Sequence, residues 1–299
     1  MSAAPRRVLL ATDHSDESRA AGKTLAALPF PAPPEVTLLH AMTVPTVSTG
    51  SGPTPIPDAA IERMQASAQT AQAAEVGPLE AAGLTVSPVI QRGKPAEVIV
   101  AAAEEGNADL VVLGAVGQSA LERLLLGSVS DRVAGATGSS CLVVRPTGWP
   151  EEGRPPRLMI AVDETPASAR AAETLAALKW PAGTSVALVS VMQTFDTFVP
   201  DFTNTLPTLW DELRTTSERR LSEAAAPFEA AGLTVTTDLQ TAAHVGEELC
   251  RRARKHQADF VAVGDHGGSA AMKFLLGSVS RYVLRHSPSS VWICRGGAD

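Results

Sequence analysis

The sequence predicts an α/β protein built from two tandem, doubly wound domains, each with a five-stranded parallel sheet of the Rossmann-like kind. Three observations indicate this fold. Short apolar runs alternate with long alanine-rich amphipathic stretches, which is the pattern of strands joined by crossover helices. The second half of the chain repeats the first. In each half, glycines directly follow an apolar strand, where sheets of this kind bind ligands.

The elements of the first half can be placed in order along the chain. Apolar runs predict strands near Arg7–Thr12, Val36–Ala41, Thr85–Ile90, Asp109–Gly114 and Leu142–Arg145. Amphipathic stretches predict helices near Ser15–Leu28, Asp58–Ala82, Pro95–Asn107 and Ser128–Thr137. Because crossovers between parallel strands are right-handed, these elements can form a doubly wound sheet that binds ligands where the winding reverses.

The segment 43–57 follows the second predicted strand and is rich in proline, glycine and serine. This composition predicts a loop without regular structure. Its position just past Ala41 would let it cover a bound ligand as a mobile lid.

The internal repeat extends over a whole domain. Val8–Asp13 aligns with Leu158–Asp163, and Glu80–Val86 aligns with Glu229–Val235. A repeat of this length is too long for a solenoid unit, so we infer a tandem duplication. The copies meet in a stretch rich in proline, glycine and charge, which predicts a linker. We expect a first domain at 1–147, a linker at 148–156 and a second domain at 157–299.

The composition fits two soluble domains. Hydrophobic residues make up 44% and charged residues 19%, which is enough apolar material for two cores. The net charge of −7 argues against a nucleic-acid partner, which would need a basic face. No apolar run approaches the roughly 20 residues of a membrane span, so we expect no membrane partner. The basic run Arg251–His256 is interpreted as the exposed side of a helix.

Cysteine usage predicts a cytoplasmic protein. The three cysteines, Cys141, Cys250 and Cys294, cannot all pair, and their spacing matches no redox or metal motif. Reduced thiols in the cytoplasm are the simplest interpretation.

A repeated glycine motif indicates phosphate binding. Its pattern is Gly-x2-Gly-x9-Gly-Ser, and the first glycine closes an apolar strand in both copies. Glycines let backbone N–H groups approach an anion closely, and the Gly-Ser step leaves unpaired amides at the start of the next helix. The motif predicts two nucleotide-phosphate cradles, formed by Gly114, Gly117, Gly127 and Ser128 and by Gly264, Gly267, Gly277 and Ser278.

On these residues each half resembles the universal stress protein domain, and the chain resembles a tandem universal stress protein. The resemblance extends from Asp13 and Asp163 to the last strands, which end at Arg145 and Arg295. It implies the strand order 3-2-1-4-5 and an ATP site between the first and fourth strands, with magnesium as the accompanying ion. It also implies dimer-like pairing of the two domains, a possible homodimer and an unidentified protein partner.

The resemblance further implies a set of site residues. Asp13 and Asp163 would lie beside the ribose and phosphates, and Ala41 and Val191 would meet adenine through their backbones. The ribose and phosphates would be held by Gly114, Gly117, Gly127, Ser128 and Ser130 in the first half, and by Gly264, Gly267, Gly277, Ser278 and Ser280 in the second.

The second half departs from the family pattern. Many ATP-binding members carry a basic residue between the first two glycines, where this chain has Ala115-Val116 and Asp265-His266. Asp265 would repel phosphate oxygens. The first site is therefore expected to bind at least as tightly as the second.

Each motif also has a simpler interpretation. The glycines can serve a tight turn and helix packing alone, Asp13 and Asp163 can cap the helices that follow, and Ser128 and Ser130 can be plain helix-start residues. A single loop histidine such as His14 is usually solvated. The remaining histidines outside the site loops are interpreted as structural or exposed: His40, His244, His256 and His286.

Catalytic motifs are missing from the sequence. It contains neither Gly-x4-Gly-Lys-(Ser/Thr) nor Gly-x-Ser-x-Gly, and no lysine, arginine or base is placed for phosphoryl transfer. The predicted function is an ATP-binding stress-response and signalling module. Two alternatives stay open: a slow ATPase, and a pseudo-dimeric scaffold that binds no nucleotide.

Overall fold

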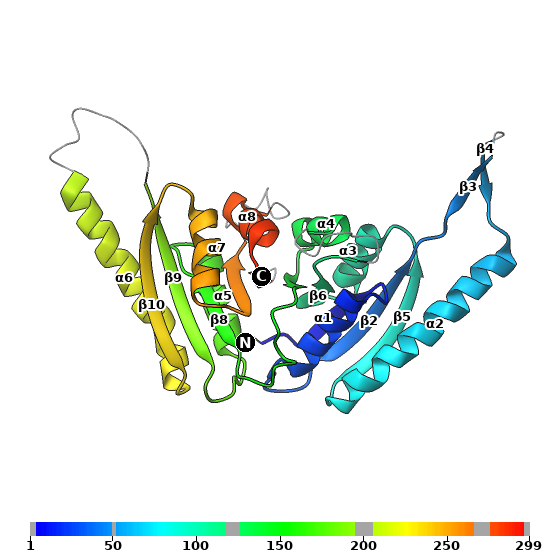
Figure 1. Cartoon of the computed structure of the whole chain (residues 1–299), viewed down its shortest axis with the longest axis horizontal. Coiled ribbons are helices and arrows are strands. Elements are labelled where there is room, and N and C mark those ends of the chain that lie inside the picture. The colour runs from blue at the N-terminus through cyan, green and yellow to red at the C-terminus, as the bar shows by residue number, and fades with distance from the viewer. Residues whose placement is uncertain (1–3, 50–51, 118–125, 195–205, 266–275, 296–299) are drawn as a thin grey trace. The chain divides into compact units, whose positions relative to one another are not determined.

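The computed structural model describes residues 4–49, 52–117, 126–194, 206–265 and 276–295 (Figure 1). The chain forms two compact units, a first domain at Pro5–Arg145 and a second domain that begins at Pro146. Each is an α/β domain with a parallel sheet.

The strands described in the first domain are β1 (Arg7–Thr12), β2 (Glu35–Met42), β5 (Thr85–Arg92), β6 (Leu110–Gly114) and β7 (Ser140–Val144). They lie in the order β5-β2-β1-β6-β7, and all neighbours are parallel. The helices are α1 (Asp16–Ala27), α2 (Asp58–Ala81), α3 (Pro95–Glu105) and α4 (Ser128–Ala136). Right-handed crossovers place α1 and α2 on one face and α3 and α4 on the other, and the helices contact each other in these pairs.

The second domain repeats this arrangement. Its strands are β8 (Arg157–Ala161), β9 (Ser185–Gln193), β10 (Thr234–Ala242), β11 (Phe260–Gly264) and β12 (Ser290–Cys294). They lie in the parallel order β10-β9-β8-β11-β12. The helices are α5 (Pro166–Ala176), α6 (Leu206–Ala230), α7 (Val245–Lys255) and α8 (Ser278–His286). The predicted fold class and the strand order 3-2-1-4-5 are therefore confirmed in both domains.

The inner strands are apolar along their whole length because helices cover both faces of the sheet. Every residue of β6 is buried, as is every residue of β1 except Arg7. The outer strand β5 is mostly exposed or half-buried. This is the burial expected of a parallel sheet, whose centre reads as a continuous hydrophobic run.

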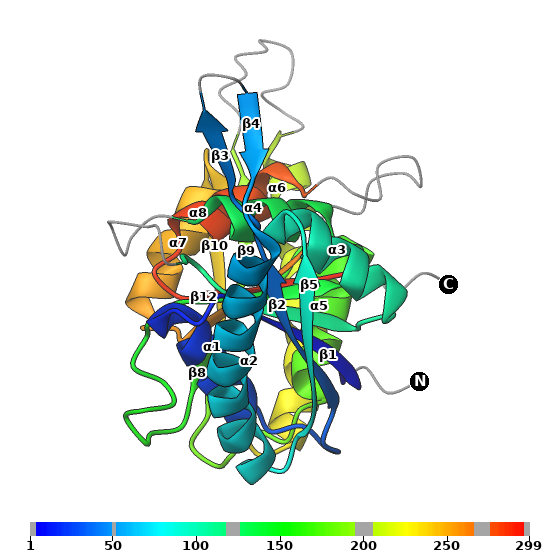
Figure 2. The same cartoon turned by 90° about the vertical axis from the view of Figure 1, so that its right-hand side faces the viewer.

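The segment expected to be an irregular lid contains a hairpin instead. β3 (Thr46–Thr49) and β4 (Gly52–Pro55) pair antiparallel, and the hairpin projects beyond the end of β2 (Figures 1 and 2). The prediction of no regular structure was wrong because prolines are tolerated where every strand is an edge, as in a two-stranded ribbon.

The predicted linker packs against the second domain. The Trp149 ring meets Phe260 edge-on, with 5.2 Å between ring centroids. The Arg154 guanidinium donates to both carboxylate oxygens of Asp259, at 2.7 and 2.8 Å, and the Asp259 side chain is only 1% exposed. The backbone N–H of Arg157 donates to the same carboxylate at 2.8 Å. Asp259 thus joins the segment before β8 to the start of β11.

We expect Arg154→Ala to lower the unfolding free energy of the second domain by about 3 kcal/mol, because the buried Asp259 carboxylate loses its bidentate partner. The chain's tryptophans, at 149, 180, 210 and 292, all lie in the second domain, so tryptophan fluorescence in a urea titration follows that domain. Arg157→Ala is the matched control: its side chain donates to Gln257 in an exposed contact, and its effect should stay within about 0.5 kcal/mol. Equal effects would contradict the role given to the ion pair.

Candidate functional site

Predicted site residues gather at the carboxyl edge of the first sheet, where β1 and β6 lie side by side. Val8–Leu10 pairs in register with Leu110–Val112, so Asp13 and Gly114 emerge at the same edge. The helix after β1 covers one face of the sheet, and the helix after β6 covers the other. The winding therefore reverses between these strands, and sheets of this kind bind ligands at such a switch point.

Asp13 organises the start of α1. Its Oδ1 accepts from the backbone N–H of Ser15 at 3.1 Å and from the Ser15 hydroxyl at 2.6 Å. Ser15 is the N-cap of α1 and accepts from the N–H of Ser18. The second domain has the same arrangement: Oδ1 of Asp163 accepts from the N–H of Thr165 at 2.8 Å and from its hydroxyl at 2.6 Å. Each aspartate orients the capping residue and does not itself cap the helix.

The first glycine of each motif permits close helix packing. A Cβ on Gly114 would lie 3.0 Å from the carbonyl carbon and oxygen of Glu17 in α1. A Cβ on Gly264 would lie 2.6 Å from the carbonyl carbon of Ala167 in α5. At these two positions the absence of a side chain serves the contact between strand end and helix.

Gly117 has a different neighbour. A Cβ at this position would collide with Oδ2 of Asp13, so a larger residue would displace the carboxylate. The second motif glycine thus lies beside the acidic group expected near the ribose and phosphates.

The third glycine begins α4. Gly127 is the N-cap, Ser128 is the first helical residue, and the N–H of Gly127 donates to the Ala115 carbonyl at 2.7 Å. A Cβ on Gly127 would lie 3.2 Å from that carbonyl oxygen. Gly127 brings no capping side chain, and helix starts of this kind offer their first-turn amides as donors to an anion. Gly277 and Ser278 begin α8 in the same way.

Ser130 joins the helix to the strand. Its hydroxyl donates to the Gly114 carbonyl at 2.7 Å, and Ser280 donates to the Gly264 carbonyl at 2.6 Å. These hydroxyl protons are used within the fold, whereas Ser128 lies two residues earlier, at the start of α4.

Ala41 and Val191 lie near the carboxyl ends of β2 and β9. Ala41 pairs with Gln91 of β5, and Val191 pairs with Gln240 of β10. Each of these strands lies next to the strand that the site aspartate follows. The backbones of Ala41 and Val191 therefore lie at the same sheet edge as the glycine motif of their domain.

The second site contains a charge pair that the first lacks. Oδ2 of Asp265 lies 3.4 Å from Nε of Arg295. Burial raises the pKa of Asp265, while Arg295 and Arg170 act in the opposite direction. The repulsion expected from Asp265 is therefore partly balanced by arginine. His266 and Gly267 lie outside the described residues.

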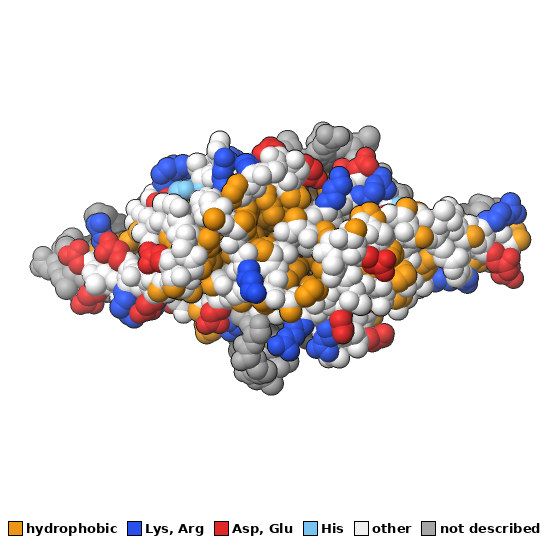
Figure 3. Space-filling model, turned by 90° about the horizontal axis from the view of Figure 1, so that it is seen from below, with side chains coloured by type: hydrophobic (Ala, Val, Ile, Leu, Met, Phe, Trp, Pro, Cys, Tyr) orange, Lys and Arg blue, Asp and Glu red, His pale blue; other side chains and the backbone are white. Residues whose placement is uncertain are grey.

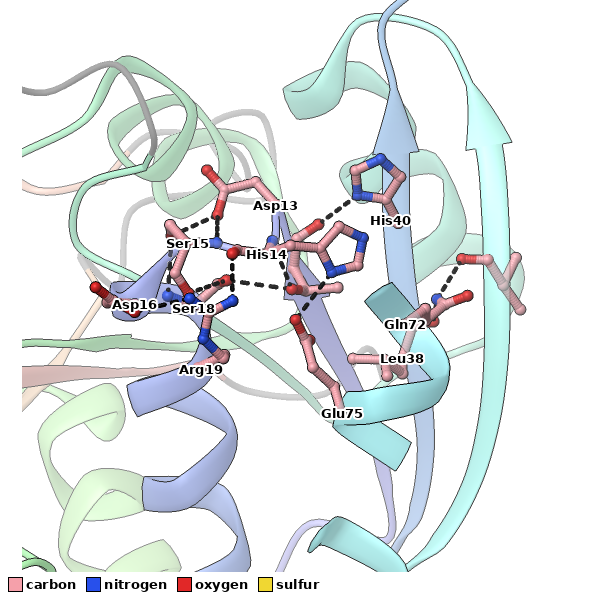
Figure 4. Close-up of polar contacts among 12 residues, drawn as sticks. Asp13, His14, Ser15, Asp16, Ser18, Arg19, Leu38, His40, Gln72 and Glu75 are labelled. Carbon is pink, nitrogen blue, oxygen red and sulfur yellow. Dashed lines mark hydrogen bonds and ion pairs between the residues drawn. The ribbon is translucent and has the colours of Figure 1, made fainter. Parts of the chain in front are cut away.

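A histidine cluster lies beside the first site (Figure 4). His14 has a left-handed backbone with φ of 63°, and its Nδ1 lies 2.8 Å from Oε1 of Glu75 in α2. Its ring stacks on His40 with 4.5 Å between centroids, and Nδ1 of His40 lies 3.0 Å from the Thr12 carbonyl. Among the described residues, none bonds to the buried Nε2 of His14. Burial lowers the pKa of His40, and the neighbouring His14 acts in the same direction.

Sequence reasoning missed this cluster by treating His14 and His40 separately. The signal was available in the strand order. His14 follows β1, and His40 precedes the end of β2, so the pairing of these strands brings the two rings to one edge. The contact with Glu75 depends on how α2 packs, which no local pattern shows.

No group of three or more His, Cys, Asp or Glu side chains in the described part of the chain could hold a metal ion. No helix there is both long and apolar enough to cross a membrane. On the face drawn in Figure 3, acidic and basic side chains are mixed.

Comparisons with known proteins match the chain over both halves. A family model described as the Universal stress protein family matches residues 5–145 and 156–295. A universal stress protein of Mycolicibacterium smegmatis is 29% identical over 294 residues, covering 96% of each chain. The universal stress protein MJ0531 of Methanocaldococcus jannaschii is 43% identical over 63 residues, which are 21% of this chain and 37% of that protein. The structure of a universal stress protein from Archaeoglobus fulgidus shares the fold, with a TM-score of 0.66 and 21% identity over 98% of this chain and 97% of that one.

Acidification should destabilise the first domain through His40. The pKa of His40 in the folded protein lies below its ordinary value of 6.5. Between these two pKa values the unfolded chain binds more protons than the folded one, so the unfolding free energy falls as the pH drops. Urea unfolding followed by circular dichroism should show a larger loss of stability between about pH 7.5 and about pH 5.5 than in His40→Ser. Serine is the residue at the matching position 190 of the second domain, and tryptophan fluorescence provides the internal reference. The same pH dependence in the unaltered protein and in His40→Ser would contradict this role of His40.

Proposed function

Because the chain belongs to the universal stress protein family and contains two of its domains, we propose that each domain binds an adenine nucleotide and that the chain is a nucleotide-dependent stress-response and signalling module. One observation carries the proposal. Asp13, Gly117 and the uncapped start of α4 converge at the β1–β6 switch point, where a Cβ on Gly117 would meet the Asp13 carboxylate and a Cβ on Gly127 would meet the Ala115 carbonyl.

The start of α4 is the proposed phosphate cradle. Its first-turn amides lack partners within the helix, and the aligned peptide dipoles add partial positive charge there. Ser128 adds a hydroxyl at the first helical position. Since Ser130 already donates to Gly114, Ser128 is the side chain proposed to bond phosphate oxygens.

The proposed nucleotide is ATP with magnesium. Magnesium binds at one or two carboxylates together with substrate phosphates, and it would neutralise phosphate charge. Asp13 fits such a role, because its Oδ1 is fixed by Ser15 while its Oδ2 faces the position of Gly117. The adenine is proposed to lie along the end of β2, against the backbone of Ala41.

The two sites are proposed to differ in strength. The loop after β6 carries the neutral Ala115, whereas the loop after β11 carries Asp265. Arg295 offsets part of that charge, so the second site is proposed to bind ATP more weakly without losing it.

The cellular setting is also a proposal. The three cysteines are buried and form no disulfide, which suits a reducing cytoplasm. We further propose that nucleotide occupancy alters contacts with a second copy of the chain or with an unidentified protein partner.

Ser128→Ala should weaken ATP binding at the first site about ten- to a hundredfold, since a hydrogen bond to a charged group contributes roughly 1.5–3 kcal/mol. Gly127→Val should abolish binding there, because its side chain would occupy the phosphate position. Calorimetry on the full chain should resolve two sites in the unaltered protein and the loss of the tighter one in Gly127→Val.

Ser278→Ala is the matched control, which should affect only the weaker site. Circular dichroism must show that each variant is folded. If folded Gly127→Val still binds two ATP with unchanged affinity, the motif is a packing turn and the scaffold interpretation replaces the nucleotide one.

A further inference from the structure

We propose that a groove between α1 and α2 of the first domain binds a medium-chain fatty acid, that is, an alkyl chain ending in a carboxylate. The groove lies along the two helices and not at the start of α4, so this ligand is distinct from the proposed nucleotide. The two helices lie side by side on one face of the sheet (Figure 2).

The groove is a sizeable and mostly apolar space. Its volume is about 370 Å³. It extends along α1 from Ser18 to Ala27, a length on the order of 13 Å at the rise of an α-helix. This length suits an extended alkyl chain. The apolar lining includes Leu10, Gly22, Ala26, Ala74, Pro78 and Leu79.

The duplicated domain shows that this space need not be empty. Gly22 aligns with Ala172, and Leu79 aligns with Phe228, so both positions carry larger side chains in the second domain. Phe228 is 1% exposed and Ala172 is 5% exposed, which shows that the larger side chains are packed there. The first domain is hollow where the second has additional side-chain volume.

Gly22 has no packing reason to be glycine. A Cβ there would lie 3.6 Å from Leu10 and 3.9 Å from Leu79, which are ordinary van der Waals contacts. Glycine inside a helix is less favourable than alanine because it loses more backbone entropy on folding. The first domain therefore carries a destabilising residue that keeps the groove open.

The sheet holds the far wall of the groove in place. Gln72 of α2 donates its side-chain N–H groups to the Leu38 carbonyl at 2.7 Å and the Val89 carbonyl at 3.0 Å. These bonds fix α2 to β2 and β5. The groove is consequently a feature of the folded domain that does not need a ligand to form.

The charges at the rim favour an acid. Arg19 and Lys23 line the groove, while the matching residues of the second domain are Ala169 and Glu173. Arg19 donates to the His14 carbonyl and pairs with Asp16 at 2.7 Å; the Asp16 contact is exposed, contributes little and can exchange for a ligand carboxylate. Glu75, the acidic residue of the lining, is directed to His14. Both the space and the basic rim are thus specific to the first domain.

Calorimetry with decanoate and the full chain tests the proposal. We expect one decanoate per chain, and at least tenfold weaker binding in the double variant Gly22→Ala/Leu79→Phe, which installs the second domain's own residues. Lys23→Glu should weaken decanoate at least tenfold but leave the binding of decanol unchanged. Ala172→Gly in the second domain is the control and should change nothing.

Several outcomes would overturn the proposal: no decanoate binding by the unaltered chain, unchanged binding in the double variant, or decanol binding as tightly as decanoate. Self-association that the double variant abolishes, without decanoate binding, would instead assign the groove to a second copy. If circular dichroism shows that the double variant is unfolded, Gly22→Ala alone should still weaken binding. The same variants should bind ATP with unchanged affinity. A negative result for decanoate would therefore leave the proposed nucleotide site untouched, and a negative result for ATP would leave the groove untouched.

Discussion

The pairing of β1 with β6 is the constraint on which the first domain's candidate site depends. These central strands end at the same edge, and the helices that follow them cover opposite faces of the sheet. This edge is a switch point because the helices after the two strands lead the chain away in opposite directions. Two polar contacts then fix its sides: Asp13 holds the capping residue of α1, and Ser130 holds α4 to the end of β6.

The duplication separates what this architecture requires from what one copy has added. Both domains keep the aspartate after the first strand, the glycine at the end of the fourth strand and the serine that bonds its carbonyl. These contacts build the sheet edge itself. The residues of the histidine cluster and of the groove are not repeated in the second domain: the changes are His14 to Glu164, His40 to Ser190, Glu75 to Ala224, Gly22 to Ala172 and Leu79 to Phe228.

Local patterns predicted most of the fold because each element carries its own signal. Buried parallel strands read as apolar runs, and the repeat supplied every strand twice, so the predicted and observed boundaries of β1 coincide. The hairpin at 46–55 was missed because its proline and glycine content normally marks loops. The roles of the glycines could not be separated by sequence: Gly114 meets a helix backbone, whereas Gly117 meets a carboxylate. Those neighbours are set by tertiary packing.

Hydrogen exchange measured by mass spectrometry, with and without saturating ATP and magnesium, tests the central claim most directly because it locates the ligand on the chain. Bound ATP should slow exchange in peptides that contain Gly114–Gly117 and Leu126–Ser130, where the proposed cradle amides lie. The corresponding peptides around Gly264 and Gly277 should respond at higher ATP concentration. Saturation without any change in these segments, or with protection confined to other parts of the chain, would contradict the assignment of the sheet edge as the nucleotide site.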